Sequence, residues 1–151
     1  MILEAVLAYA HFGAILTLVV FMTSQAALCR PEWLNANVVR RLGRVDRIYW
    51  GAIAAVFITG GARMAWGAKG FDWYAAQPLM VFKLALFGAI ALMSLRPTRL
   101  FSRWRQTLEA TGRLPAAAEV DTARRSVMIE AHLFLLLPLA AVFVARGLGT
   151  T

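Results

Sequence analysis

The chain begins with an apolar run that a water-soluble fold could not cover. No charged residue lies between Ala5 and Cys29, and about 20 mostly apolar residues are enough for a helix to cross a bilayer. Hydrophobic residues make up 60% of the 151 residues and charged residues 16%, whereas soluble domains are about 45–50% apolar. The run follows a single charge, Glu4, and lacks the basic region of a signal peptide. We therefore expect it to be a membrane span.

Three more stretches are long and apolar enough to cross a bilayer. The predicted spans are residues 5–29, 46–67, 78–95 and 126–146. Four spans with short connectors favour an all-α fold, an integral membrane four-helix bundle with up-down-up-down topology. At this length residues 1–151 form a single membrane domain.

Basic residues are concentrated in two connectors. Residues 30–47 hold five arginines and residues 96–125 hold seven, against Arg63, Lys69 and Arg146 on the other side. The positive-inside rule then places both arginine-rich connectors in the cytoplasm and both termini outside. Apolar residues recur at helical spacing among these arginines, so we expect a short amphipathic helix on the membrane surface in each connector. Such a face would attract anionic lipids.

Two histidines are candidate cofactor ligands. At 1.5 Å per residue, His11 lies about 13–15 Å below the outer surface and His132 roughly 21 Å below it. Imidazole at such depth can pack against a neighbouring helix, relay protons or bind haem iron. Tilt can absorb part of the difference in depth, so a haem held by both histidines is one alternative. Met64 and Met80 are other candidates for the second iron ligand beside His11.

Four charged residues fall within the spans or at their ends. Arg63 and Lys83 lie toward the outer side, where they can either extend to the interface or form a cationic shelf for a haem propionate, a lipid phosphate or a substrate carboxylate. Asp46 and Glu130 lie toward the inner side, close in sequence to arginines. We expect inter-helix ion pairs there, with a proton path as the alternative.

Several functions have no support in the sequence. It contains no phosphate-binding glycine loop, HExxH motif or nucleophile elbow, which argues against kinases, proteases and hydrolases. The net charge of +8 reports topology rather than nucleic-acid binding, so we expect no nucleic-acid partner. The spans lack matched broken helices, so a small-solute transporter is a weaker alternative.

Several segments carry a family resemblance. The segments Leu7-Ala8-Tyr9-Ala10-His11-Phe12, Arg44-Val45-Asp46-Arg47-Ile48-Tyr49-Trp50-Gly51 and Thr59-Gly60-Gly61-Ala62-Arg63 resemble the bacterial domain-of-unknown-function family numbered 2214. The resemblance covers nearly the whole chain and implies a small four-span protein of the bacterial inner membrane. His11 and Lys83 also look similar to positions in the haem-binding four-span protoporphyrinogen oxidase and copper-resistance D families. That looser resemblance implies His11 as a haem ligand.

Two hypotheses of different classes follow. In the first, the protein holds one haem b through His11 and either His132 or a methionine, with Arg63 and Lys83 on the propionates. It would exchange electrons with a lipid-soluble partner such as a quinone or a porphyrin-type molecule. In the second, it is a non-enzymatic membrane subunit or scaffold whose buried polar residues join the helices. Either protein could form a homo-oligomer.

Overall fold

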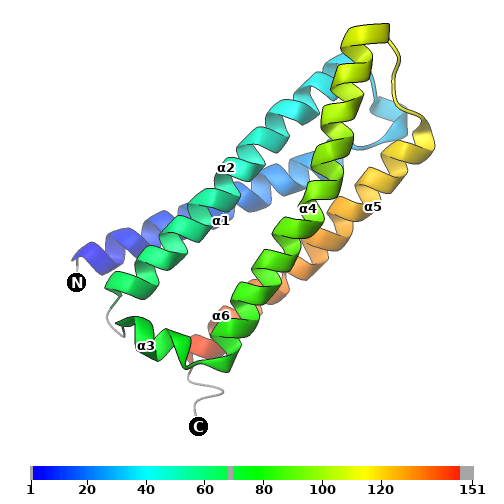
Figure 1. The fold of residues 1–151 in the computed structure, drawn as a ribbon. Helices are drawn as coiled ribbons and strands as arrows, with labels where there is room; N and C mark the ends of the chain where they lie inside the picture. The colour runs from blue at the N-terminus through cyan, green and yellow to red at the C-terminus, as the bar shows by residue number, and fades with distance from the viewer. Residues whose placement is uncertain (1, 68–69, 147–151) are drawn as a thin grey trace.

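A computed structural model of the chain describes residues 2–67 and 70–146, which form helices and contain no strand. Figure 1 shows α1 (Ile2–Leu28), the 3-10 helix η1 (Pro31–Trp33), α2 (Ala36–Trp66), α3 (Gly70–Ala75), α4 (Pro78–Thr111), α5 (Ala117–Phe134) and α6 (Leu136–Ala145). Among these residues, four helical segments have the length and apolar composition of membrane spans, the last combining α5 and α6. The predicted all-α membrane fold is confirmed. Lys69, one of the basic residues assigned to the outer side, lies outside the described residues.

Local sequence signals explain where the long helices begin and end. The Asn35 side chain accepts hydrogen bonds from the amides of Asn37 and Val38, both at 3.0 Å, and so caps α2. Pro78 occupies the first turn of α4, where an amide hydrogen is not needed. Gly112 ends α4 with a φ of 71° and donates to the Leu108 carbonyl at 2.9 Å.

The fourth span is interrupted at Leu135, between α5 and α6. The cause is Pro138, because a proline ring cannot accept the helical position of the carbonyl four residues earlier and provides no amide hydrogen. Pro138 itself lines the cavity described below. The interruption therefore lies beside the candidate site.

The helices alternate in direction, and the two ends of the bundle differ (Figure 1). We call one the arginine end (residues 29–45 and 96–125), because η1 and most of the arginines lie there. The other is the cavity end (residues 2–11, 56–67, 70–87 and 134–146), where α1 begins, α6 ends and α3 joins α2 to α4.

The prediction of a separate surface helix in each arginine-rich connector is wrong. Residues 36–47 are the first turns of α2, and residues 96–111 are the last turns of α4. The apolar periodicity continues through Val39, Leu42 and Val45 without a helix breaker, so the helix simply lengthens. Pro97 removes one backbone hydrogen bond within α4, yet it is buried in the bundle and the helix continues past it.

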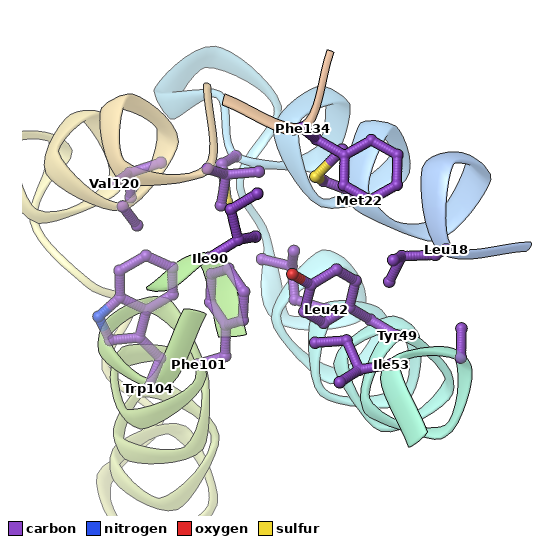
Figure 2. Close-up of a cluster of buried hydrophobic side chains, with 14 of the residues drawn as sticks. Leu18, Met22, Leu42, Tyr49, Ile53, Ile90, Phe101, Trp104, Val120 and Phe134 are labelled. Carbon is purple, nitrogen blue, oxygen red and sulfur yellow. The ribbon is translucent and has the colours of Figure 1, made fainter. Parts of the chain in front are cut away.

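Packing is tightest toward the arginine end. The residues Val39, Leu42, Phe101, Trp104 and Val120 are no more than 2% exposed. Figure 2 shows the core that they share with neighbouring side chains of α1, α2, α4 and α5. At the cavity end, by contrast, the first buried residue of α4 is Ile90, about three turns into the helix. The bundle is therefore filled at one end and hollow at the other.

Candidate functional site

A cavity of about 810 Å³ occupies the hollow end of the bundle. This volume lies in the range of roughly 300–1,000 Å³ that small-molecule sites occupy. All six α-helices contribute to its lining, which consists of His11, Ile15, Val56, Phe57, Gly60, Gly61, Arg63, Met64, Phe71, Trp73, Tyr74, Ala75, Met80, Val81, Lys83, Leu84, Phe87, Phe134, Leu137, Pro138 and Ala141. The wall is mostly apolar and carries three basic side chains but no carboxylate from the described residues.

Helical spacing explains why these residues meet. On α2, the lining residues Val56, Gly60, Arg63 and Met64 follow positions i, i+4, i+7 and i+8, which share one helix face. On α4, Met80, Lys83, Leu84 and Phe87 follow i, i+3, i+4 and i+7. α2 and α4 therefore each present one continuous row of lining residues to the cavity.

His11 is 7% exposed and bonds to α2 through its Nδ1 atom, which lies 2.8 Å from Thr59 Oγ1. The Thr59 hydroxyl has one hydrogen, which it donates to the Ala55 carbonyl at 2.6 Å. Thr59 therefore accepts from His11, so the hydrogen of the neutral ring is on Nδ1. The lone pair of Nε2 is left available to a ligand, as in haem and zinc sites where the second ring nitrogen donates to the protein.

Gly60 makes room for this ring. A Cβ atom at position 60 would lie 3.2 Å from His11 Cε1, which is closer than ordinary van der Waals contact. A Cβ at the adjacent Gly61 would meet no atom within 4 Å. The absence of a side chain at position 60 thus lets His11 lie directly against the α2 backbone.

Arg63 and Lys83 are half-buried and line the same cavity. Within the described part of the chain, neither forms an ion pair with a carboxylate within 4.0 Å. A cation in an apolar wall is stabilised by a counter-ion. The site can therefore receive an amphiphilic anion, with its negative groups on these two cations and its apolar body against the wall. The structure brings together His11, Arg63, Lys83, Met64 and Met80.

His132 is not part of this cavity. Its side chain is exposed on the outside of α5, and its Nδ1 lies 2.6 Å from the Met128 carbonyl one turn earlier. Glu130, two residues away, is fully buried, as the different faces of positions i and i+2 require. The structure therefore does not place His132 with His11.

Asp46 and Glu130 are buried without the ion pairs that we expected, and that expectation is wrong for the described residues. Asp46 Oδ1 accepts from Gln25 Nε2 at 3.0 Å and from Thr98 Oγ1 at 2.9 Å. Glu130 Oε2 lies 2.8 Å from Ser94 Oγ. Neutral partners on neighbouring helices thus take the place of the nearby arginines.

Sequence reasoning missed most of these neutral partners. Thr59, Gln25, Ser94 and Thr98 all stand within predominantly apolar helices. A polar residue in such a helix is usually hydrogen-bonded to its own backbone or to another helix. The signal that could have found them is this isolation, combined with one helical turn separating Ser94 from Thr98.

The arginine end carries two other features. A smaller hollow of about 250 Å³ is lined by Arg96, Arg99, Leu100 and Arg103. Cys29 follows α1 and is fully buried there. Burial raises the pKa of its thiol to about 12, although the positive charge of Arg124 acts in the opposite direction. This cysteine is therefore an unreactive packing residue at neutral pH.

One comparison identifies the family. The family described as "Predicted membrane protein (DUF2214)" matches residues 3–149, so the chain belongs to this family. No curated protein and no solved structure matches the chain.

Proposed function

We propose that this DUF2214 family member binds one haem b in the cavity and exchanges electrons with a lipid-soluble partner such as a quinone or a porphyrin-type molecule. The observation that carries the proposal is a single cavity holding an available imidazole nitrogen and two cations without a carboxylate partner. Haem combines an iron that takes imidazole, an apolar ring system and two anionic propionates. These three requirements match the chemical groups of the wall.

His11 would hold the iron through Nε2, because its Nδ1 hydrogen is already donated to Thr59. Arg63 and Lys83 would hold the propionates through charge-assisted hydrogen bonds. Bound haem would supply one-electron redox chemistry, and the protein would set its potential through the axial ligands and the apolar surroundings.

Met64 and Met80 are the better candidates for the second iron ligand, because both line the cavity whereas His132 does not. A thioether paired with an imidazole raises the potential of a haem relative to many other ligand pairs. Methionine is also a common filler of apolar gaps, so each of the two has to be tested by substitution.

The experiment is a reduced-minus-oxidised visible spectrum of the full chain purified in mild detergent after expression with ample haem supply. We expect a Soret band that is lost in His11→Ala and kept in the matched control His132→Ala. Replacing Arg63 or Lys83 with Gln should weaken haem retention. A colourless but folded wild-type protein would refute the proposal, as would a Soret band unaffected by His11→Ala.

The proposed location is the bacterial inner membrane, with the arginine end in the cytoplasm and both termini on the periplasmic side. Twelve arginines in two connectors against three basic residues around the opposite end support this orientation. A reporter fused to the C-terminus and active only in the periplasm should give a signal. Activity of a cytoplasm-specific reporter at the same position would contradict it.

A second candidate function is that of a non-enzymatic membrane subunit held by anionic lipids. It is favoured by the hollow at the arginine end, where Arg96, Arg99 and Arg103 gather around Leu100. Each basic residue near an anionic leaflet contributes about 1 kcal/mol. The triple replacement of these arginines by Gln should lower co-purification of phosphatidylglycerol. Unchanged lipid content would argue against this role, and the haem spectrum tests the first candidate separately.

A further inference from the structure

A buried hydrogen-bond cluster lies between the cavity and the arginine end. Three atoms surround Ser94 Oγ within hydrogen-bond distance: Tyr49 Oη at 2.6 Å, the Ile90 carbonyl oxygen at 2.8 Å and Glu130 Oε2 at 2.8 Å. The Tyr49, Ser94 and Glu130 side chains are at most 1% exposed. The cluster joins α2, α4 and α5 in a region without access to bulk water.

The number of hydrogens available to Ser94 constrains the direction of each bond. A hydroxyl has one hydrogen to donate and two lone pairs to accept with. The Ile90 carbonyl can only accept, so the bond at 2.8 Å uses the hydrogen of Ser94. Glu130 Oε2 lies at the same 2.8 Å and competes for that one hydrogen, so with the hydrogen donated to Ile90 both Tyr49 and Glu130 have to donate to Ser94. If Glu130 accepted instead, the Ser94 and Ile90 oxygens would face each other at 2.8 Å without a hydrogen between them.

The second carboxyl oxygen leads to the same conclusion. Glu130 Oε1 is buried and has no hydrogen-bond partner in the described chain. Glu130 also forms no ion pair within 4.0 Å with any described cation. An ionised carboxylate in such a place would lose its hydration without compensation, whereas a neutral carboxyl would lose much less.

Asp46 provides a built-in comparison. Its Oδ1 accepts from the Gln25 amide and from the Thr98 hydroxyl, and Thr98 in turn accepts from Trp50 Nε1 at 2.8 Å. All of these hydrogens point toward Asp46, which is the pattern of a carboxylate. Two buried carboxyl groups on neighbouring helices thus have opposite hydrogen-bond patterns.

The groups that face Glu130 favour its neutral form. From α2 the titratable neighbours are Asp46, whose negative charge opposes a second one, and Tyr49. The contact from α4 is the neutral Ser94. On α5 itself, Arg124 and Arg125 lie six and five residues earlier and form no ion pair with Glu130.

We infer that Glu130 is an intramembrane proton-binding site, which holds one proton at neutral pH as a carboxylic acid donating to Ser94. Release would require a water molecule to enter the cluster. The O–H bond of Glu130 would then break and the proton would pass to that water, giving a carboxylate and hydronium without any change in oxidation state. Glu130 stands one helical turn before Phe134, which lines the cavity. The inference does not depend on what occupies the cavity.

The test is infrared spectroscopy of the full chain in lipid nanodiscs at pH 7. A buried carboxylic acid gives a C=O stretching band above the amide bands, and this band shifts in deuterium oxide. We expect one such band in the wild type, shifted to lower frequency by [13C]glutamate labelling and unaffected by [13C]aspartate labelling. This measurement needs no substitution, so it does not depend on a variant that folds.

Two variants give the matched comparison. Glu130→Gln should abolish the band while keeping the fold, because the Gln amide can still donate to Ser94. Asp46→Asn should leave the band in place. Absence of the band from the wild type would overturn the inference. So would its shift with labelled aspartate, or its persistence in folded Glu130→Gln.

Discussion

The contact between His11 and Gly60 allows a test in which two neighbouring substitutions differ in one interaction. Gly60→Ala and Gly61→Ala both replace a glycine inside α2, and each should gain about 1 kcal/mol from the better helix propensity of alanine. The new methyl at position 60 would stand 3.2 Å from His11 Cε1, whereas that at position 61 would meet nothing within 4 Å.

The His11 ring must therefore move by a few tenths of an ångström in Gly60→Ala alone. That shift stretches its 2.8 Å hydrogen bond to Thr59, a type of bond with a net value of about 0.5–1.5 kcal/mol. We expect Gly60→Ala to be less stable than Gly61→Ala by roughly 0.5–1.5 kcal/mol, up to the full value of that bond. The measurement is reversible unfolding of the detergent-solubilised protein, followed by circular dichroism.

A double-mutant cycle assigns the difference to the ring. In a His11→Ala background, the two alanine substitutions should have equal effects, because the group that position 60 would contact is absent. Equal stability of the two single variants in the native background would refute the reasoning. A penalty for Gly60→Ala that survives the removal of His11 would refute it equally, since it would then arise from backbone packing.

Three further expectations concern residues at the arginine end of the bundle or next to it. Asp46→Ala leaves two buried donors without an acceptor, so it should lower the free energy of unfolding by about 2–5 kcal/mol. The control Asp72→Ala changes an exposed aspartate and should have no measurable effect. Equal effects of the two substitutions would contradict this account. Asn35→Ala removes the N-terminal cap of α2 and should lower the free energy of unfolding by about 1 kcal/mol. The control is Asn37→Ala, and a larger loss of stability in this control would exclude the capping role. The Cys29 thiol should resist maleimide at pH 7 until the chain unfolds, and rapid labelling of the native protein would disprove its burial. The folded pKa of this thiol, about 12, exceeds the ordinary 9.0, so the unfolded chain releases this proton first. Stability should therefore fall as the pH rises between these values, and the fall should be smaller in Cys29→Ala.

The architecture could be predicted because hydropathy and charge act over many residues at once. The charge-free run from Ala5 to Cys29 required a span whatever its neighbours were, and the four candidate spans follow from the same property. Helix ends were harder to predict, because a helix can continue beyond the residues that cross the lipid. The arginine-bearing turns after Asn35 continue the helix although they are too polar for the membrane interior.

The site could be predicted only in part, because hydropathy does not fix the rotation of a helix about its axis. Depth alone allowed His11 and His132 to be compared, whereas the structure turns the first toward the cavity and the second outward. The proximity of Asp46 and Glu130 to arginines in the sequence also led to a wrong prediction, since neither carboxyl group forms an ion pair with a described cation. These hydrogen-bond partners lie on other helices, 21 to 52 residues away, so the spacing of residues in the sequence does not reveal them.

The lengths of α2 and α4 have a consequence for how the molecule responds to its surroundings. At 31 and 34 residues these helices extend about 46 and 51 Å, against a hydrocarbon thickness of about 30 Å. The excess, which carries the best-packed apolar core, stands where water competes for contact and is held by the hydrophobic effect. The cavity end is surrounded by lipid instead, and its apolar contacts gain nothing from the hydrophobic effect, because lipid tails are as apolar as the side chains. Urea, which acts in the aqueous phase, can thus unfold the arginine end of the bundle while the cavity end remains folded.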